Sequence, residues 1–457
     1  MGKLFGTNGI RGRIGFELKP DIIIKIGLAV GTYFNGGEIL IGQDGRTSSP
    51  IVKRALISGI LATGCNISDA GLITTPALQY GIWKLKFDGG VMITASHNPP
   101  EFNGIKVIGE DGIEIPRKKE EEIERIFFEE KIKRAAWNRL GKVRDAPEII
   151  PIYVEAIKRQ VNVKRISTYG FNLLRDPGNG VSTLTVPKLL KELNCKFQLV
   201  NDAIDGRFPG RGPEPTPQAL RDISKITKKI NADLGVSYDG DGDRAIFTDE
   251  EGKVHWGDKT GAIIAKHLLT KNNGGIIVTP VSSSIVVKKV AEKYGGIINW
   301  TKVGSVVVSH ELKRVNGLMG MEENGGVMYP KHQYVRDGAM TTALILELIA
   351  EKKKKLAELI ARLPKYYSSK EKIKCPNNLK NIIIKKLTEE VKNSMKNKSK
   401  IEVIDGVKIW LNKDTWVLVR ASGTEPLIRI YAEAKELEEA KNNAIKYKKK
   451  IASLLGG

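Results

Sequence analysis

The sequence contains few cysteines and no long hydrophobic run, and each of these shortages excludes a class of protein. Its three cysteines, Cys65, Cys195 and Cys375, lie far apart with no CxxC pair, so neither a disulfide framework nor a zinc site is indicated. No apolar run reaches the ~18 residues of a membrane-spanning helix, and no stretch resembles a signal peptide. These absences predict a protein of the reducing cytoplasm without a membrane partner.

Aromatic residues are also scarce, at 6% of the chain, whereas basic residues are abundant. The 74 lysines and arginines against 52 aspartates and glutamates give a formal net charge of +22, which attracts nucleic acids and small acidic substrates alike. The lysine runs at 352–355 and 446–450 read as solvated helix faces, and no stripe of aromatic and basic residues suited to stacking bases is found. We therefore expect no nucleic-acid partner, and keep a basic nucleic-acid-binding protein as the alternative from a different functional class.

The length of the chain and its repeats predict several domains. At about 150 residues per domain, 457 residues correspond to roughly three domains, and a fourth is allowed. A unit of strand, small polar loop, helix and strand begins near Glu38, Phe171 and Gly275. Three copies favour three α/β domains of one topology, with mixed, largely parallel sheets whose loops build sites around a central cleft. Coincidental patterning of this kind is the alternative.

Changes in composition place the domain boundaries at short segments near residues 142–151, 252 and 364–369. The expected domains are 1–148, 149–253, 254–365 and 366–457. The first three are α/β domains, and the last is a smaller α+β domain with an antiparallel sheet packed on helices. The elements expected around these boundaries are a charged helix at 117–134, sheet segments at 401–410, 415–419 and 428–432, and helices at 380–395 and 435–455.

A short loop after an apolar strand has the residues for nucleophile or phosphoryl chemistry. The run at 91–93 ends at TASHNPP, where two prolines stiffen a loop whose tip carries Ser96 and His97. Lys106 follows, past an Asn-Gly pair at which the chain can turn back. A hydroxyl, an imidazole and an ammonium near the carboxyl end of a strand favour such chemistry, and a plain proline-capped turn is the alternative.

Three aspartates at alternate positions, Asp239, Asp241 and Asp243, are the strongest local signal for a metal site. Their carboxylates repel one another unless a cation lies among them, and the intervening glycines permit the tight turns that aim them inward. We expect one Mg²⁺, because a few carboxylates completed by a phosphate oxygen suit its octahedral geometry. A calcium EF-hand is the rival, with Glu250 at its twelfth place, but Arg244 replaces the sixth-place glycine and β-like runs flank the loop. An acidic turn without metal is the other alternative.

Three further stretches have the composition of ligand-binding loops. Glycines around Arg11, near the start of the chain, would let the backbone approach a phosphate to which the guanidinium can bind. Glu322 and Asn324, beside flexible glycines, could hold sugar hydroxyls or an amino group, or form a solvated turn. The loop at 301–305 could contact a sugar or phosphate, and His332, near the same glycines, could help to bind phosphate.

The last domain offers a phosphate cradle between two strands. Two hydroxyls, turn amides and two guanidiniums occur together, which suits multidentate binding without a reactive group, and a polar hairpin loop is the alternative. The residues concerned are Arg420, Ser422, Gly423, Thr424 and Arg429. Among the histidines outside these loops, His255, His267 and His310 are expected to be structural.

With these motifs in this order, the chain resembles the α-D-phosphohexomutases, the four-domain family of phosphoglucomutase, phosphomannomutase and phosphoglucosamine mutase. The resemblance spans the whole chain and all four family motifs. FGTNGIRG, ASHNP followed by NGIK, and SGTEPLIR are most similar to the phosphoglucosamine mutases. One departure is that Asn324, Gly325 and Gly326 stand where many members have serine, glycine and histidine, which bears on the sugar preference and on one proposed acid–base role.

The resemblance implies an isomerase that moves phosphate between the 6- and 1-positions of a hexose through a phosphoserine and a hexose 1,6-bisphosphate. Glucosamine 6-phosphate is the favoured substrate, with phosphomannomutase/phosphoglucomutase activity as the first alternative and a metal-dependent phosphatase as another. A homodimer is compatible with the resemblance.

The family's residue roles carry over to matching positions of this chain. Ser96 is implied to be the phosphorylated serine and, with the three aspartates, a ligand of magnesium. Arg11, Lys106 and Arg244 are implied around the transferring phosphoryl group, where His97 or Lys106 could move a proton. Binding roles are implied for Glu322 and Asn324 at the sugar, and for Arg420, Ser422, Gly423, Thr424 and Arg429 at the substrate's phosphate.

Overall fold

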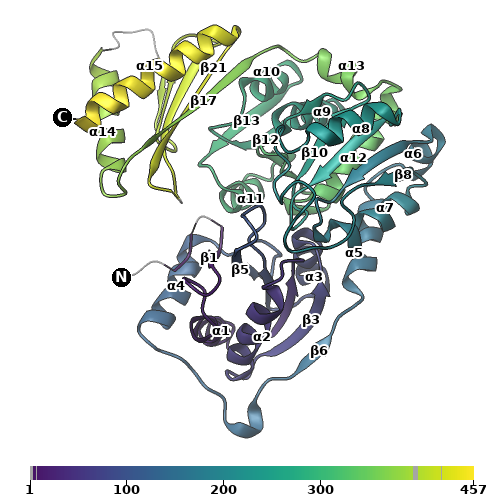
Figure 1. The fold of residues 1–457 in the computed structure, drawn as a ribbon, viewed down its shortest axis with the longest axis vertical. Helices are drawn as coiled ribbons and strands as arrows, with labels where there is room; N and C mark the ends of the chain where they lie inside the picture. The colour runs from purple at the N-terminus through teal and green to yellow at the C-terminus, as the bar shows by residue number, and fades with distance from the viewer. Residues whose placement is uncertain (1–3, 7, 395–399, 424, 457) are drawn as a thin grey trace.

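The computed structural model describes residues 4–6, 8–394, 400–423 and 425–456, which form four β-sheets in succession along the chain. Figure 1 shows the sheets following one another from the N-terminal to the C-terminal part of the molecule. Thr424, expected in the phosphate cradle, and Met395, expected at the end of a helix, lie outside the described residues. The first three sheets each mix parallel and antiparallel strands, and the fourth is antiparallel throughout.

The first domain is a six-stranded sheet in the order β1-β5-β4-β2-β3-β6 with helices against it. Its strands are β1 (Ile10–Arg13), β2 (Glu38–Gln43), β3 (Asn66–Leu72), β4 (Gly89–Ile93), β5 (Phe102–Gly109) and β6 (Val143–Asp145), and its longer helices are α1 (Pro20–Phe34), α2 (Ser49–Leu61), α3 (Thr75–Leu85) and α4 (Arg117–Phe128). Helix α4 is shorter than the helix predicted at 117–134, so that prediction was wrong at its C-terminal end. Glu130 adopts a left-handed φ of 55°, which no α-helix continues through.

The second domain is a five-stranded sheet in the order β11-β10-β9-β7-β8. Its strands are β7 (Asn172–Asp176), β8 (Lys196–Leu199), β9 (Leu234–Tyr238), β10 (Ala245–Asp249) and β11 (Val254–His255), and its helices are α5 (Ile149–Lys158), α6 (Val163–Tyr169), α7 (Val186–Glu192) and α8 (Arg221–Lys229). A short 3₁₀ turn at Val181–Leu184 precedes α7, so the helix predicted in this repeat is split, with Pro187 in the first turn of its second piece.

The third domain is a five-stranded sheet in the order β13-β12-β14-β15-β16. Its strands are β12 (Gly275–Pro280), β13 (Gly296–Thr301), β14 (Met319–Met321), β15 (Val327–Tyr329) and β16 (Gln333–Arg336), and its helices are α9 (Gly257–Asn272), α10 (Ile285–Lys293), α11 (Ser305–Arg314), α12 (Gly338–Lys352) and α13 (Leu356–Ala361).

These three domains share one strand arrangement. In each, the first strand of the repeat lies between the second and third in a parallel trio, and the next strand in sequence adds antiparallel to the third, as in β3-β2-β4-β5, β8-β7-β9-β10 and β13-β12-β14-β15. The helix-linked crossovers of the repeat place neighbouring strands in parallel, as such connections require. The prediction of three α/β domains of one topology is therefore confirmed.

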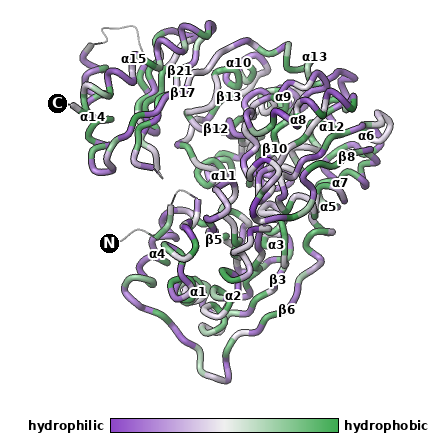
Figure 2. Tube along the Cα trace, in the orientation of Figure 1, coloured by the Kyte–Doolittle hydropathy of each residue, from purple (hydrophilic) through white to green (hydrophobic). Residues whose placement is uncertain are grey.

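The last domain is a smaller α+β unit, as predicted. Its elements are β17 (Tyr367–Lys374), α14 (Lys380–Ser394), β18 (Ile401–Glu402), β19 (Val407–Trp410), β20 (Trp416–Ala421), β21 (Leu427–Ala434) and α15 (Leu437–Gly456). Alternating residues of β20 face opposite sides: Val417 and Val419 pack in the core under α14 and α15, whereas Trp416 and Leu418 pack against the third domain. Figure 2 shows hydrophobic and hydrophilic residues alternating along the helices of this domain.

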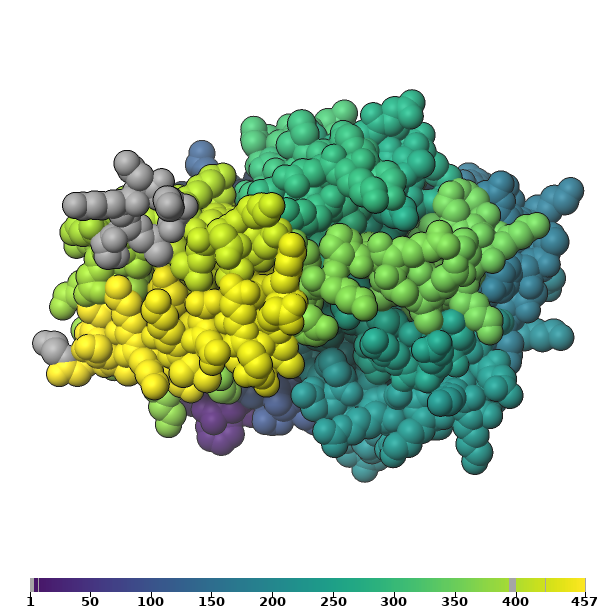
Figure 3. All heavy atoms as spheres, turned by 90° about the horizontal axis from the view of Figure 1, so that it is seen from above, coloured from purple at the N-terminus to yellow at the C-terminus, as the bar shows by residue number. Residues whose placement is uncertain are grey.

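One large hydrophobic cluster joins the first three domains, while the first domain also has a separate core that includes side chains of α1 and α2, and the last domain has a core of its own. Leu40 of β2, Phe247 of β10 and Met319 of β14 belong to one cluster of buried side chains. The last domain is linked to this body by the segment after α13, and Figure 3 shows that light-green segment lying between the yellow last domain and the teal domains. Within the described residues, no helix has both the length and the hydrophobicity needed to cross a membrane.

Candidate active site

Ser96 lies in the loop that follows β4, and its backbone is held in an uncommon conformation. Its φ is 49°, in the left-handed region that a residue other than glycine rarely adopts, and its side chain is 1% exposed. Its amide donates to the hydroxyl of Thr94 (2.8 Å). Its own hydroxyl donates to Oδ2 of Asp239 (2.8 Å) and lies 3.3 Å from Nδ1 of His97. The backbone therefore orients the Ser96 hydroxyl, in the first domain, toward the aspartates of the second domain.

Arg46 fixes this loop in place, a role that was missing from the sequence-based prediction. Its guanidinium donates to the carbonyl oxygens of Ser96 (2.9 Å), Asn98 (2.6 Å), Pro99 (2.7 Å) and Phe102 (3.0 Å), and Nε binds a carboxylate oxygen of the preceding loop (3.1 Å). That carboxylate, Asp44, is fully buried and also accepts from Ser49 and Thr94. The signal in the sequence was the pair Asp44 and Arg46 directly after a strand, which was read only as a helix-capping loop.

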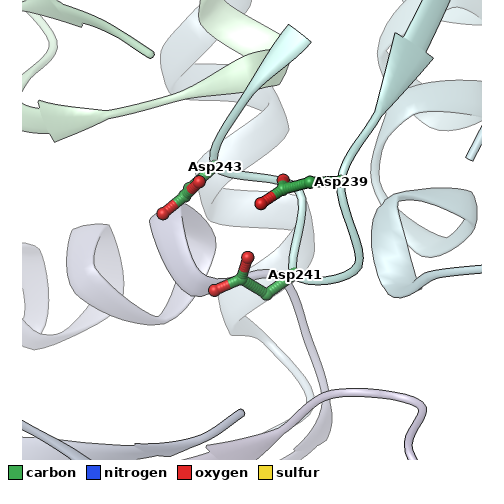
Figure 4. Close-up of side chains that lie close together, drawn as sticks. All are labelled: Asp239, Asp241 and Asp243. Atoms are coloured by element: carbon green, nitrogen blue, oxygen red, sulfur yellow. The ribbon is translucent and has the colours of Figure 1, made fainter. Parts of the chain in front are cut away.

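The three aspartates occupy the turn between β9 and β10 and converge on one point, as Figure 4 shows. All three are buried, and one carboxylate oxygen from each lies within 4.8 Å of the others. Burial, together with the charge of Asp243, raises the pKa of Asp239 to about 7. Burial acts in the same sense on Asp241, but the charge of Lys106, the hydrogen bond from Thr75 and the charge of Arg336 together outweigh it and lower that pKa.

The donor set fits a divalent cation. Oδ1 of Asp241 and Oδ1 of Asp243 are buried and have no hydrogen-bond partner among the described residues, which is costly for a carboxylate unless a ligand takes the place of water. Oxygen-only donors suit a hard cation such as magnesium or calcium. The flanking elements are the antiparallel strands β9 and β10, whereas an EF-hand loop requires helices.

Buried cations from all three α/β domains surround the aspartates. Nζ of Lys106, on β5, lies 3.3 Å from Asp241, 3.7 Å from Asp243 and 3.4 Å from Glu114. Burial opposes protonation of Lys106, but the charges of Glu114 and Asp241 outweigh it and raise its pKa, so the side chain stays an ammonium. Nε of Arg244 lies 3.1 Å from Asp239.

Arg336, at the end of β16, links the aspartate turn to the loop that carries Glu322 and Asn324, called the sugar loop below. One of its amino groups lies 2.5 Å from Asp243, and the other lies 2.9 Å from Glu322. The guanidinium therefore bridges the second and third domains. Nothing local in the sequence indicates this role for Arg336, because its partner Asp243 lies 93 residues away.

The remaining candidates near the cluster are Arg11, His97 and Asn324. Arg11 donates to the side chain of Asn98 (2.7 Å), and its buried Nε has no partner among the described residues. Burial and the nearby charge of Arg244 lower the pKa of His97 to about 2, so its imidazole is neutral. Asn324 accepts a hydrogen bond from the amide of Gly326 (3.3 Å), which makes the sugar loop an ordered turn.

This cluster has one more buried carboxylate than it has cations. The carboxylates are Asp239, Asp241, Asp243, Glu114 and Glu322, and the cations are Arg11, Lys106, Arg244 and Arg336. Because buried charge is stable only when balanced, an additional cation would be favoured. The cavity between Glu114, Asp243, Ser305 and Arg336 measures only about 10 Å³, so the cluster is closely packed.

The loop of the last domain is built separately from this cluster. Arg420 binds Asp405 (2.8 Å), Arg429 binds Glu425 (2.5 Å), and Lys380 donates to the carbonyl of Ser422 (2.6 Å). Among the described residues, no hydrogen bond or ion pair joins Arg420, Ser422, Gly423 or Arg429 to the catalytic cluster. Of the predicted site residues, those of the first three domains are brought together, and those of the last domain are not.

The other histidines have structural partners, as the sequence suggested. His255 lies 2.6 Å from Asp249, His267 lies between Glu347 and Glu351, and His310 contacts the carbonyl of Glu114 (2.9 Å). His332, predicted to help bind phosphate beside the sugar loop, instead stacks on Tyr80 of the first domain at 4.8 Å between ring centres. It is 3% exposed and contacts Asp337 rather than the sugar loop.

Comparison with known proteins identifies the family. Four consecutive segments match the phosphoglucomutase/phosphomannomutase family: residues 2–134, 151–252 and 256–367 match its alpha/beta/alpha domains I, II and III, and 371–446 match its C-terminal domain. The chain is 46% identical, over 99% of both chains, to a phosphoglucosamine/phosphogalactosamine mutase of Sulfurisphaera tokodaii. It is 45% identical, over 96% of both chains, to a phosphoglucomutase/phosphomannomutase of Thermococcus kodakarensis.

A solved structure shows the same four-domain architecture. A phosphoglucomutase/phosphomannomutase family protein from Burkholderia thailandensis superposes with a TM-score of 0.86 at 26% identity, covering 98% of this chain and 97% of that one. The matched segments, the relatives that span the whole chain and the common fold agree with one another. This chain belongs to the phosphoglucomutase/phosphomannomutase family, the α-D-phosphohexomutases, and is a phosphohexomutase.

Proposed function

We propose that this phosphohexomutase works in the cytoplasm on amino sugars and converts glucosamine 6-phosphate to glucosamine 1-phosphate by way of phospho-Ser96 and glucosamine 1,6-bisphosphate. The observation that carries the proposal is the hydrogen bond from the Ser96 hydroxyl to Asp239 (2.8 Å), which places the serine of the first domain at the aspartate cluster of the second. The amino-sugar preference is supported by the 46% identical relative, which is named phosphoglucosamine/phosphogalactosamine mutase.

The chemistry follows from the charges around Ser96. In the first half-reaction, the bond from phosphorus to Oγ of Ser96 breaks and a bond to a sugar hydroxyl forms, while the hydroxyl's proton passes to a base. Lys106 is held as an ammonium and stabilises the phosphoryl oxygens instead of accepting that proton. His97 lies 3.3 Å from Oγ and its imidazole is neutral, but a pKa lowered to about 2 makes it a weak base, so neither side chain is a strong general base in this arrangement.

We propose that Asp239, Asp241 and Asp243, with the phosphoryl group on Ser96, bind one magnesium ion, which neutralises charge on the transferring phosphoryl group. Arg244 and Arg11 would also contact the transferring phosphoryl group. Glu322 and Asn324 would bind the sugar, and Arg420, Ser422, Gly423, Thr424 and Arg429 would bind its second phosphate. Since no hydrogen bond or ion pair among the described residues joins the last-domain loop to the aspartate cluster, we expect domain movement when substrate binds.

Replacing Ser96 tests the proposal directly. We expect Ser96→Ala to lose measurable mutase turnover, because no hydroxyl remains to carry the phosphoryl group, and to keep the melting temperature of the wild type within a few degrees. Undiminished turnover in Ser96→Ala would overturn the phosphoserine mechanism. A catalytic amount of hexose 1,6-bisphosphate should activate the unphosphorylated wild-type enzyme and have no effect on Ser96→Ala.

A substrate panel distinguishes the alternatives. Glucosamine, galactosamine, glucose and mannose 6-phosphates would be compared by kcat/KM, and a higher value for either neutral hexose than for the amino sugars would overturn the preference. The 45% identical relative named phosphoglucomutase/phosphomannomutase makes that alternative concrete. A phosphatase would release inorganic phosphate in proportion to turnover, whereas a mutase releases almost none. A nucleic-acid-binding protein would instead show salt-sensitive retention on DNA or RNA.

A further inference from the structure

A second cavity lies where the first three domains meet, and none of its lining residues belongs to the catalytic cluster. It measures about 370 Å³ and is lined by α3 of the first domain, α5 of the second and the turn between β15 and β16 of the third. Figure 1 shows α3 and α5 close together on the side of the molecule away from the last domain. A cavity of this size is in the range of small-molecule sites, which are typically about 300–1,000 Å³.

The cavity is positively charged. Its lining contains the cations Lys84, Arg159 and Lys331, and the one carboxylate in that lining is Glu155. Glu155 is already shared between Arg159 (3.1 Å) and Lys158 (3.3 Å). Lys84 and Lys331 form no ion pair with any described residue, so their charges are free to bind an anion.

An exposed aromatic ring lies beside these cations. Trp83 lines the cavity and is 49% exposed, so part of its indole ring is accessible to a ligand. Tyr80 holds it edge-on at 5.7 Å between ring centres and is itself stacked on His332. An anchored aromatic face of this kind suits stacking with a planar heterocycle, which contributes about 1–3 kcal/mol per base in nucleic-acid complexes.

A buried polar atom in the cavity lining lacks a partner. His332 lines the cavity and is 3% exposed; its Nε2 lies 3.3 Å from Asp337, but neither ring nitrogen forms a hydrogen bond with a described residue. A buried ring nitrogen without a partner is rare in folded proteins and calls for a ligand or water. A hydroxyl or phosphate oxygen in the cavity would satisfy it.

From these features together we propose that this cavity is a second binding site, separate from the active site, for a nucleoside phosphate. Lys84, Arg159 and Lys331 would neutralise its phosphates, and its base would lie against Trp83. A free phosphate or pyrophosphate would use the cations alone. The proposal therefore requires a nucleotide to bind more tightly than the corresponding inorganic anion.

The position of the site links it to the active site. Lys331 and His332 immediately precede β16, the strand that ends at Arg336, which binds Asp243 and Glu322. The next residue, Asp337, accepts hydrogen bonds from Tyr153 (2.6 Å) and Gln333 (2.8 Å), so the turn is anchored to the second domain. A ligand that orders this turn changes the restraint on Arg336, and we expect it to change the catalytic rate.

Calorimetric titration with ADP tests binding, at a fixed excess of free magnesium and with pyrophosphate as the comparison without a base. We expect the double variant Lys84→Glu/Lys331→Glu to weaken ADP binding by about ten-fold or more, equivalent to about 1.4 kcal/mol. The control is Lys229→Glu, which reverses the charge of an exposed lysine on α8 and should bind as the wild type does. All three lysines are exposed, so the variants should fold. Equal ADP affinity in the double variant and the control, or no binding to the wild type, would overturn the site.

Two further measurements test the parts of the proposal separately. Trp83→Phe should reduce the preference for ADP over pyrophosphate, and equal affinity of the wild type for the two ligands would overturn the base contact. Saturating ADP should change kcat or KM of the wild type by about two-fold or more, and this change should disappear in Lys84→Glu/Lys331→Glu. A rate that does not respond to ADP would overturn the link to Arg336. Neither result depends on which hexose phosphate the enzyme prefers.

Discussion

At the scale of single residues, the site depends on one strained serine and the arginine that holds it. A residue other than glycine in the left-handed region costs about 1–2 kcal/mol, and Ser96 adopts it with a φ of 49°. Arg46 offsets this cost, because its planar guanidinium binds four carbonyl oxygens of the loop and the carboxylate of Asp44 at once. The conformation of the Ser96 loop is thus set by an arginine that lies outside the aspartate cluster.

Replacing Arg46 by lysine should therefore damage activity more than the conservative change suggests. A lysine ammonium has three donors and no planar fork, so it cannot bind all five acceptors. We expect kcat/KM to fall by about 100-fold or more, as for misplaced catalytic groups, and the melting temperature to fall as well. Arg54→Lys, on the exposed face of α2, is the matched control and should leave both unchanged. Wild-type activity in Arg46→Lys would show that the loop holds its shape without the clamp.

Metal binding should appear as thermal stabilisation that depends on the buried aspartates. Magnesium at about 100 times its Kd should stabilise the wild type by about 2.7 kcal/mol, because it binds the folded chain alone. Asp241→Asn removes one of the unpartnered carboxylates and should abolish most of this shift in a thermal melt with and without the ion. Asp222→Asn, at an exposed aspartate of α8, should keep it. A full shift in Asp241→Asn would mean that the ion binds elsewhere.

The site residues that the sequence revealed lie in short motifs, whereas the ones it did not reveal have no motif around them. Asp239, Asp241 and Asp243 stand at alternate positions, so their shared purpose is visible in five consecutive residues. Glu114 and Arg336 reach the same cluster from other domains, and neither has a motif around it. Arg336 contacts Asp243 across 93 residues, and Glu114 joins the cluster through Lys106 of its own domain, so no local pattern reveals either role.

At the scale of elements, helices α1 and α2 pack at glycines that leave no room for a side chain. A Cβ atom on Gly59 would come within 2.3 Å of the carbonyl oxygen of Ile24, and one on Gly27 within 2.4 Å of that of Leu56. This close approach brings the two helices together on the sheet that carries the serine loop. The backbone of one helix is thus part of the packing surface of the other.

Gly59→Ala should lower stability, since neither backbone can move away without disturbing the sheet below. Overpacking of this kind costs about 1–3 kcal/mol, despite the better helix propensity of alanine, and should lower the melting temperature. The neighbouring exposed residue offers the control: Ser58→Ala should change stability by less than about 0.5 kcal/mol. A Gly59→Ala variant as stable as the wild type would show that the helices can separate freely.

Element types were more predictable than element ends. The repeated strand, loop, helix and strand pattern was visible because buried parallel strands are continuous apolar runs bounded by polar loops. The helix predicted at 117–134 ends at Phe128, because the left-handed φ of Glu130 turns the backbone away from the helix. The charged pattern in the sequence continues past this point, so the predicted helix was too long. Helical periodicity alone carries no information about that turn.

At the scale of the whole molecule, the last domain is attached to the third through a junction of buried charges. Glu433 of β21 accepts hydrogen bonds from Ser284 (2.5 Å), the amide of Ile285 (2.7 Å) and Trp416 (2.8 Å). Lys408 donates to the carbonyl of Val281 (2.8 Å) and lies over the rings of Trp300, Trp410 and Trp416. Movement of the last domain must work against these contacts.

This junction should make stability depend on pH through Asp258. Burial, with the charges of Glu323 and Glu433, raises the pKa of Asp258 to about 8. Between about pH 4 and pH 8 the folded chain keeps a proton that the unfolded chain has lost, so stability falls as pH rises through this window. Asp258→Asn should flatten that fall and be more stable than the wild type above pH 8, by roughly 1–3 kcal/mol.

Thermal melts across the pH range would check this prediction. Near pH 4 the variant and the wild type should melt at similar temperatures, because the carboxyl is then protonated in both folded and unfolded chains. Glu292→Gln, at an exposed position of α10, should follow the wild type at every pH. An unchanged pH profile in Asp258→Asn would assign the dependence to another group.

Four domains were expected from the sequence, but their different degrees of coupling were not. The structure shows one cluster of buried side chains that spans the first three domains, beside separate cores in the first and the last domain. Which apolar faces pack against neighbouring domains depends on the relative orientation of the sheets. The phosphate loop of the last domain was recognisable by composition, and its separation from the catalytic cluster was not.

The burial of Lys106 has a consequence for the nascent chain. As the first domain leaves the ribosome, the partners Asp241 and Asp243 have not yet been synthesised, and N-terminal domains generally fold first. Glu114, eight residues further along, is the one ion-pair partner that the first domain itself supplies among the described residues. It can therefore neutralise the ammonium during translation, before the second domain has been synthesised.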